Sequence, residues 1–201
     1  MAAEKLDTEI RREQIAEAAL ALLGTGGVKG LNMAAVAHRL GLVSSAIYRH
    51  FKGKDEVLDA VLGLIAQRLK NNVCIVRAES TNSLDRLENL LTRHVRLIRE
   101  NQAIPRIMFS DEIARGDPRR KARLHQTICD FLGRVSEIAQ EGQRNGEIRS
   151  DVEPETVAML FVGIVQPGAV LWSLSDGQFD ITRHAKRAWR LFRASVATEE
   201  G

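Results

Sequence analysis

The chain has 201 residues, of which 44% are hydrophobic, so it can bury a core without disulfides or a structural metal. The formal net charge of +3 is only mildly basic, and overall charge therefore does not identify a nucleic-acid partner. The two cysteines, Cys74 and Cys129, match no paired spacing, which excludes a disulfide framework and predicts reduced thiols. No apolar run approaches the roughly 18 residues of a membrane-spanning helix, and we expect a cytoplasmic protein with no membrane partner.

Apolar residues recur at helical spacing almost throughout, and the alternation typical of strands is missing, which predicts an all-α fold. Thr8 is suited to cap a first helix that stops at the glycines of residues 24–27. We expect about nine helices in total. After the first, they are expected at residues 33–40, 44–51, 54–79, 84–100, 105–110, 118–144, 154–174 and 181–196.

Residues 31–54 contain no Asp or Glu, although they hold several cations. Within this stretch Val36 and Ala37 precede Gly41, which permits the left-handed backbone of a sharp turn. Ile47 and Phe51 are four residues apart, so they share the buried face of the following helix. This is the pattern of a helix-turn-helix.

The outward face of that motif carries small and polar side chains, which can approach a groove and donate to phosphate oxygens. An acid-free surface suits a polyanion. A solvated helical hairpin with incidental charge would show the same spacing, and the spacing alone leaves that alternative open. The expected DNA-contacting residues are Asn32, Ser44, Ser45, Ala46, Tyr48, Arg49, His50 and Lys54.

The stretch from Arg12 to Leu58, REQIAEAALALLGTGGVKGLNMAAVAHRLGLVSSAIYRHFKGKDEVL, resembles the tetracycline-repressor-like (TetR/AcrR) family of bacterial transcriptional regulators. The family pattern is met at Ile15, Gly27, Asn32, Val36, Ala37, Gly41, Tyr48, His50, Phe51 and Lys54. One departure is Val43, which stands where the family usually has a serine cap. Either Ser44 caps one residue later or the start of the helix is shifted.

The resemblance implies an N-terminal three-helix DNA-binding domain, residues 1–53, and a larger helical-bundle domain for ligand binding and dimerisation, residues 54–201. It implies a repressor that binds a palindromic operator as a homodimer and is released by a small effector. The alternative is a DNA-binding dimer that is controlled by a protein partner or that works without a small-molecule ligand. The first fifty residues do not distinguish the two, because they would be the same in both.

The dimer is expected through the last two helices, 154–174 and 181–196. One apolar stripe holds Leu160, Ile164, Gly168 and Leu171, and the other holds Ala185, Trp189, Phe192 and Val196. Both stripes could instead face the protein's own core. Pro167 cannot donate to the carbonyl of Gly163, which predicts a kink that either opens space for a ligand or fits two dimer helices together.

The resemblance also implies an effector cavity among the helices between Leu84 and Leu174. The candidate lining residues are Ile98, Met108, Phe109, His125, Ile128, Cys129, Phe161 and Trp172, and each could equally be plain core. The nine aromatic residues argue against a multi-aromatic cage for large cations. A neutral or weakly acidic, largely apolar molecule is expected, with His94 or His125 as its polar partner.

No phosphate-binding glycine loop, nucleophile elbow or paired acids point to catalysis, so we expect no enzyme and no cofactor. His125 and Cys129 are four residues apart on one helix and could bind zinc. A third ligand at helical spacing is missing, and no metal site is expected.

Overall fold

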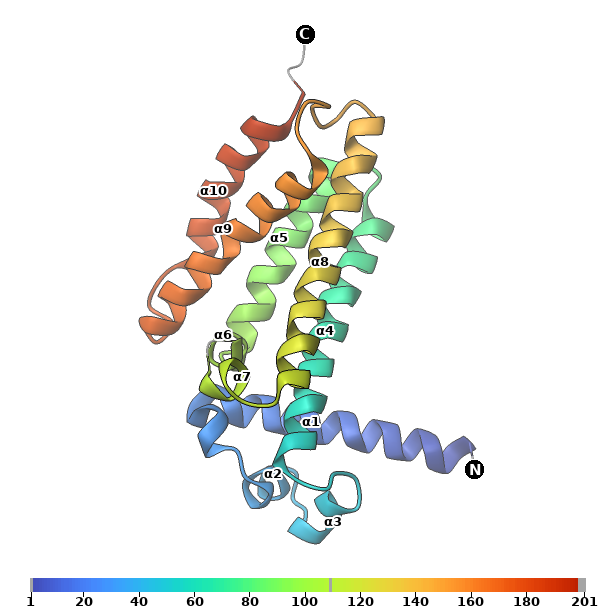
Figure 1. Ribbon diagram of the computed structural model, residues 1–201, viewed down its shortest axis with the longest axis vertical. Helices are drawn as coiled ribbons and strands as arrows, with labels where there is room; N and C mark the ends of the chain where they lie inside the picture. Colours follow the sequence, from blue (N-terminus) through green and yellow to red (C-terminus); the bar gives the residue numbers. More distant parts are fainter. Residues whose placement is uncertain (1, 109, 199–201) are drawn as a thin grey trace. The chain divides into compact units, whose positions relative to one another are not determined.

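The structure is a computed structural model that describes residues 2–108 and 110–198, and these form ten helices. Among the described residues no strand occurs, only an isolated bridge between Ile148 and Ala197, and the predicted all-α fold is confirmed. The helices (Figure 1) are α1 (Ala2–Gly30), α2 (Met33–Arg39), α3 (Ser44–Tyr48), α4 (Lys54–Glu79), α5 (Ser83–Glu100), α6 (Ala103–Met108), α7 (Asp111–Ala114), α8 (Pro118–Arg144), α9 (Pro154–Leu174) and α10 (Ile181–Val196).

Most helix ends agree with the sequence pattern, and the differences have local causes. Helix α1 already begins at Ala2, and it continues to Gly30 across a break at Gly27, whose φ of 62° is left-handed. Helix α3 ends at Tyr48 rather than Phe51. Asp111 and Glu112 form the first turn of α7, which is the helix that the sequence did not indicate.

The chain divides into two compact units. The first contains the residues up to Arg68 together with Asn101–Leu124, and the second contains Leu69–Glu100 and the chain from His125 onward. Helices α4 and α8 each begin in the first unit and end in the second. The predicted domain boundary after residue 53 stays a prediction.

The first unit is built on α1, which packs against α2 and α6. Ile15, Ala19 and Leu23 lie on one helical face of α1 and are fully buried. Close to its end, Gly24 lies against the start of α6, where a Cβ would stand in ordinary contact, 3.5 Å from the backbone nitrogen of Ala103. Arg106 on α6 donates to the Gly24 carbonyl oxygen at 2.6 Å and fixes this contact.

The second unit has one apolar core among the end of α4, α5, most of α8, α9 and α10. Helices α9 and α10 lie side by side in it (Figure 1). Phe192 joins two aromatic contacts, with its ring centroid 6.0 Å from that of Phe161 and 5.4 Å from that of Trp189. Gly142 of α8 allows a close approach to α5, because a Cβ there would stand 2.8 Å from the Cβ of Ser83.

The prediction that the apolar stripe of α10 forms the dimer contact is wrong. Ala185, Trp189, Phe192 and Val196 are all buried within their own unit. On α9 the predicted stripe is split: Leu160 and Leu171 are exposed, whereas Ile164 and Gly168 face the core. A Cβ at Gly168 would stand 2.9 Å from the His184 ring of α10, and His184 Nε2 lies 3.0 Å from the carbonyl oxygen of Ile164.

Helix α9 also has the length and composition of a membrane-spanning segment, with a mean hydropathy of 1.9. This property was not expected from the sequence. Half of its apolar window is buried inside the second unit, and this burial accounts for part of the composition. The helix runs continuously through Pro167, which lies on its exposed face.

Candidate nucleic-acid interface

Helices α2 and α3 form the predicted helix-turn-helix. Asn32 is the N-cap of α2, and its side-chain oxygen accepts from the Ala35 amide at 2.8 Å. Gly41 follows α2 with a φ of 66°, and the Leu42 amide then donates to the Ala37 carbonyl oxygen at 2.9 Å. The left-handed glycine lets the chain reverse between the two helices.

Helix α3 begins at Ser44 despite the departure at its cap. Val43 occupies the N-cap with extended backbone and no side-chain hydrogen bond, while its carbonyl oxygen accepts from the Ala46 amide at 2.9 Å. The helix start is therefore not shifted. Ser44 is partly exposed and Ser45 exposed, as expected for the front of a helix that approaches a groove.

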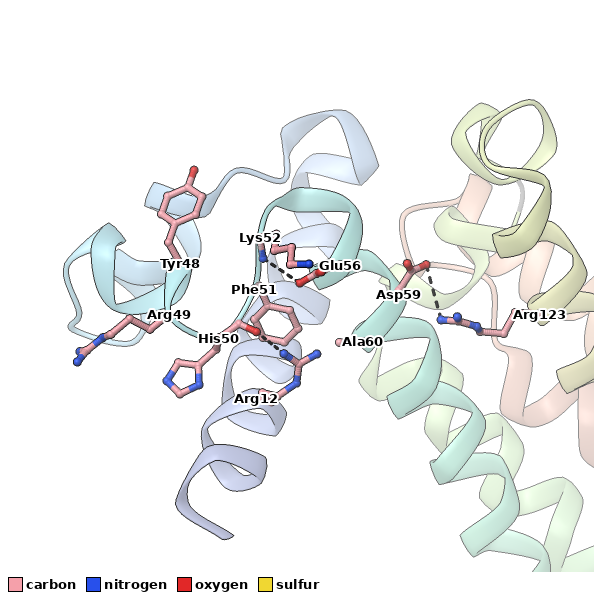
Figure 2. A pocket seen from close by; sticks show the side chains of 10 residues that line it. All are labelled: Arg12, Tyr48, Arg49, His50, Phe51, Lys52, Glu56, Asp59, Ala60 and Arg123. Carbon is pink, nitrogen blue, oxygen red and sulfur yellow. Dashed lines mark hydrogen bonds and ion pairs between the residues drawn. The ribbon is translucent and has the colours of Figure 1, made fainter. Parts of the chain in front are cut away.

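The two faces of α3 divide as the four-residue spacing predicted, with one correction. Ile47 is fully buried and Phe51, just beyond the helix, nearly so. Ala46 was predicted to face DNA, but it is only 9% exposed because it lies beside Ile47 on the buried side. Tyr48 and Arg49 are exposed and extend away from the unit (Figure 2).

Arg12 of α1 supports this helix from the inside, a role that sequence reasoning missed. Its guanidinium donates to the carbonyl oxygen of His50 and lies 4.1 Å from the centroid of the Phe51 ring (Figure 2). The first contact satisfies a carbonyl just after the end of α3, and the second is a cation–π interaction. Only the position of Arg12 one turn before Ile15 could have indicated an inward side chain.

His50 lies among cations and is not itself a fixed positive charge. Its burial and the charges of Arg49, Arg11 and Arg12 lower the pKa of His50 below 6.5. The ring is therefore harder to protonate than a free imidazole, and in its neutral form it can still donate a hydrogen bond to a phosphate. Its Nδ1 is buried and has no hydrogen-bond partner among the described residues.

The start of α4 follows α3 directly and carries Lys54, which is partly exposed. The amide of Lys52, two residues before α4, donates to the Glu56 carboxylate at 2.8 Å and ties the incoming chain to the first turn of this helix. An open hollow runs beside these residues (Figure 2) and is lined by Arg12, Tyr48, Arg49, His50, Phe51, Lys52, Glu56, Asp59, Ala60 and Arg123. The acidic side chains that line this hollow, Glu56 and Asp59, come from α4. The part of the hollow that suits a polyanion is therefore the part formed by α3 and the residues just after it.

Arg120 of α8 holds the first two turns of α4, and this contact too was not predicted. It is only 5% exposed, and its guanidinium donates to Asp59 at 2.9 Å and to Asp55 at 3.1 Å. A buried guanidinium needs such partners, because an unpaired charge would be costly to desolvate. The pair of carboxylates therefore fixes the turn that presents Lys54.

The predicted effector residues do not gather in one place. Ile98, Phe161 and Trp172 belong to the core of the second unit. On α8, Ile128 is partly buried, whereas His125 and Cys129 are exposed, with the Cys129 sulfur 3.7 Å from His125 Nε2. Met108 lies partly buried in the first unit. Phe109 lies outside the described residues.

His94 of α5 is the polar group within the second unit that stands out. Its ring meets that of Phe131 edge-on at a centroid distance of 5.2 Å, and burial lowers the pKa of His94 to about 4. The ring is therefore neutral at pH 7. Its Nδ1 is buried without a hydrogen-bond partner among residues 2–108 and 110–198, which leaves a polar atom able to accept from or donate to a ligand.

Two family descriptions match the chain. The description "Bacterial regulatory proteins, tetR family" matches residues 15–61, and "Tetracyclin repressor-like, C-terminal domain" matches residues 80–196. Among curated proteins, nucleoid occlusion factor SlmA of Idiomarina loihiensis is 23% identical over 186 residues, covering 92% of this chain and 95% of that protein. The SlmA of Vibrio vulnificus is 22% identical over 187 residues, with 92% and 95% covered.

Solved structures show the same fold. The fatty acid degradation regulator FadR from Bacillus halodurans superposes with a TM-score of 0.77 at 18% identity, covering 90% of this chain and 94% of that chain. The ketosteroid transcriptional regulator KstR2 of Mycobacterium tuberculosis gives a TM-score of 0.70 at 20% identity, with 94% and 96% covered. At these identities the likeness concerns the fold.

The contact between Arg12 and the end of α3 can be tested by removing the guanidinium. We expect Arg12→Met to destabilise the first unit by about 1–3 kcal/mol, since it removes a charged hydrogen bond and a cation–π contact. Hydrogen exchange should accelerate at the amides of residues 44–51. Arg11→Met is the matched control, because it removes an exposed charge of the same sign. Equal exchange in both variants would contradict this role for Arg12.

Proposed function

Because the chain belongs to the tetR family of bacterial regulatory proteins, we propose that it is a transcriptional repressor that binds an operator as a homodimer and leaves it when a small, largely apolar molecule binds the second unit. Proteins of this family are DNA-binding regulators and not enzymes. The observation that carries the proposal is the acid-free outer face of α3, with Tyr48 and Arg49 exposed on a rigidly held helix-turn-helix.

In this proposal α3 is the reading helix. Ser44 and Ser45 allow close approach to the major groove, Arg49 and Tyr48 contact bases or phosphates, and Lys54 contacts a phosphate from the start of α4. Asn32 caps α2 and presents that helix end to the backbone. A dimer presents two reading helices, so the operator should be a palindrome with half-sites about one helical turn apart or slightly more.

Selection from random duplexes with purified protein should enrich such a palindrome. We expect Arg49→Ala to weaken operator binding and Lys54→Ala to weaken binding to all sequences about equally. The latter change should reduce the slope of log affinity against log salt by about 0.9 for each phosphate that is no longer neutralised. Lys70→Ala, an exposed change further along α4, is the control. A selection that enriches no motif would refute operator binding.

The second copy is proposed to sit on the outer face of α9. Large apolar side chains are exposed there at Met159, Leu160, Leu171 and Leu174, and exposed Gly163 in their midst allows two helices to approach closely. Leu191 of α10 is 76% exposed and extends the apolar surface. Such a contiguous apolar surface on a soluble chain is typical of an interface.

Two substitutions separate this dimer face from the core. We expect Leu171→Glu to give a folded monomer, because it places a charge in the proposed interface and leaves the core intact. Trp189→Glu should instead unfold the second unit, since Trp189 is buried within it. Sedimentation velocity and circular dichroism measure both outcomes. A folded dimer of Leu171→Glu would place the interface elsewhere.

The effector is proposed to bind in the second unit near His94, with Ile98, Phe161 and Trp172 as apolar neighbours in the same core. The unpartnered Nδ1 of a neutral His94 supports a ligand that combines an apolar body with one hydrogen-bonding group. The remaining predicted residues, Met108, Phe109, His125, Ile128 and Cys129, have no comparable orphaned polar atom to support them. The regulators of similar fold concern fatty acid degradation and ketosteroids, which guides the choice of probes.

A long-chain fatty acid and a steroid ketone are the first probes. A compound that is an effector should raise the melting temperature and lower operator affinity about 5-fold to 150-fold, the usual range of allosteric coupling. His94→Phe keeps the ring but removes its nitrogens, and we expect it to weaken this effect. Wild-type protein should lose stability as the pH falls from 6.5 toward 4, because only the unfolded state then binds a proton at His94, and the variant should lack this part of the pH dependence. His125→Phe is the exposed control. Compounds that bind without changing operator affinity would favour control by a protein partner.

A further inference from the structure

Helix α10 has two unlike faces. Its core face is formed by Ile181, Ala185, Trp189, Phe192 and Val196, all of them buried. The opposite face carries five cations between residues 183 and 193, and all are exposed. They are Arg183, Lys186, Arg187, Arg190 and Arg193. The helix contains no Asp or Glu between its two ends, so the outer face is a cationic stripe.

The five head groups of the cationic stripe have no carboxylate within ion-pairing distance among the described residues. Elsewhere in the same unit arginines are paired: Arg77 and Arg86 share Glu141, each at 2.7 Å, and Arg93 meets Glu79 at 2.8 Å. Arg77, Arg86 and Arg93 are thus compensated by carboxylates, whereas the five cations of the stripe are not.

This arrangement destabilises the isolated helix. Arg183 with Arg187 and Lys186 with Arg190 are like charges four residues apart, and each such pair costs about 0.2–0.5 kcal/mol. Arg183 also places a cation in the first turn, where the helix dipole disfavours it. A binding partner with dense negative charge would reverse both effects.

The character of the stripe distinguishes between partners. Protein interfaces are depleted of charge at their centre and bury apolar or aromatic groups, but the exposed apolar side chains among the cations are only Leu191 and Ala194. An interfacial membrane helix needs apolar side chains to insert, and those of α10 are in the core. Leu191, which is 76% exposed, is assigned to the proposed dimer. Phosphate groups along a duplex match the stripe best.

We propose that the outer face of α10 is a second DNA-binding surface, which contacts the phosphate backbone without sequence preference. Four of its five cations are arginines, whose planar forks suit phosphate oxygens. From Arg183 to Arg193 the stripe extends about 15 Å along the helix, over which a duplex presents a negative charge every 1.7 Å or so. A dimer bound at its operator then holds a further duplex through α10.

Non-operator binding tests the stripe independently of the operator. The background is the full-length Arg49→Ala, Lys54→Ala protein, in which the proposed reading surface is weakened. Added changes Arg183→Gln, Arg187→Gln and Arg190→Gln should reduce the affinity for a non-operator duplex at least about tenfold, and the salt slope by roughly 2.7 if each cation meets one phosphate. The matched control changes three exposed cations elsewhere, Lys70, Lys121 and Arg144, to Gln, so that net charge falls equally.

Capture of a second duplex tests the consequence. Wild-type dimer on bead-bound operator should retain a labelled non-operator duplex, the triple α10 variant should lose it, and the control should keep it, while all three retain the operator equally. Equal capture by the α10 variant, or no capture by wild type, overturns the proposal. A monomeric α10 variant would also overturn the proposal, because it would place the stripe in the dimer interface. Stripe-dependent binding to phosphatidylserine vesicles or polyglutamate, without binding to DNA, would overturn it as well. Failure to find an operator would refute the proposed function and leave the non-operator measurement valid.

Discussion

A helix of five residues cannot exist alone in water, and α3 is that short. Its conformation depends on what it buries: Ile47 and Phe51 pack inward, and Arg12 binds the carbonyl that follows the helix. Everything attributed to the outer face presupposes this support, because Tyr48 and Arg49 could not hold a fixed position on a fraying turn. The specificity of a DNA-contacting surface here begins with the packing on its hidden side.

The short-range features could be predicted from the sequence. Asn32 caps the helix that directly follows it, and Gly41 forms the turn at its own position in the sequence. The apolar spacing predicts the ends of α4, α8, α9 and α10 to within a residue or two. The supporting contacts could not. Arg12 meets His50 across 38 positions and Arg120 meets Asp59 across 61, and neither pair leaves a local pattern. Such a pair becomes visible only when the fold brings the two segments together.

A helical stripe shows that a face is buried, but it does not show against what. The stripe of Trp189 and Phe192 satisfies every criterion of a dimer helix and yet fills its own unit. Helix α9 is apolar almost all round, so one side serves the core and leaves Leu160 and Leu171 outside. The composition of α9 rather than its periodicity was the better signal, because a helix that is apolar on both faces has two surfaces to cover.

The distribution of charge is more informative than its sum of +3. Carboxylates in this chain are used where helices must be tied: Asp55 and Asp59 hold Arg120, and Glu141 holds Arg77 and Arg86. The outer faces of α3 and α10 contain no acids. A surface that lacks acids keeps its cations uncompensated, and such cations act beyond contact range over roughly one Debye length, about 8–10 Å. The chain therefore has two local positive fields, at α3 and at α10, that its nearly balanced composition does not reveal.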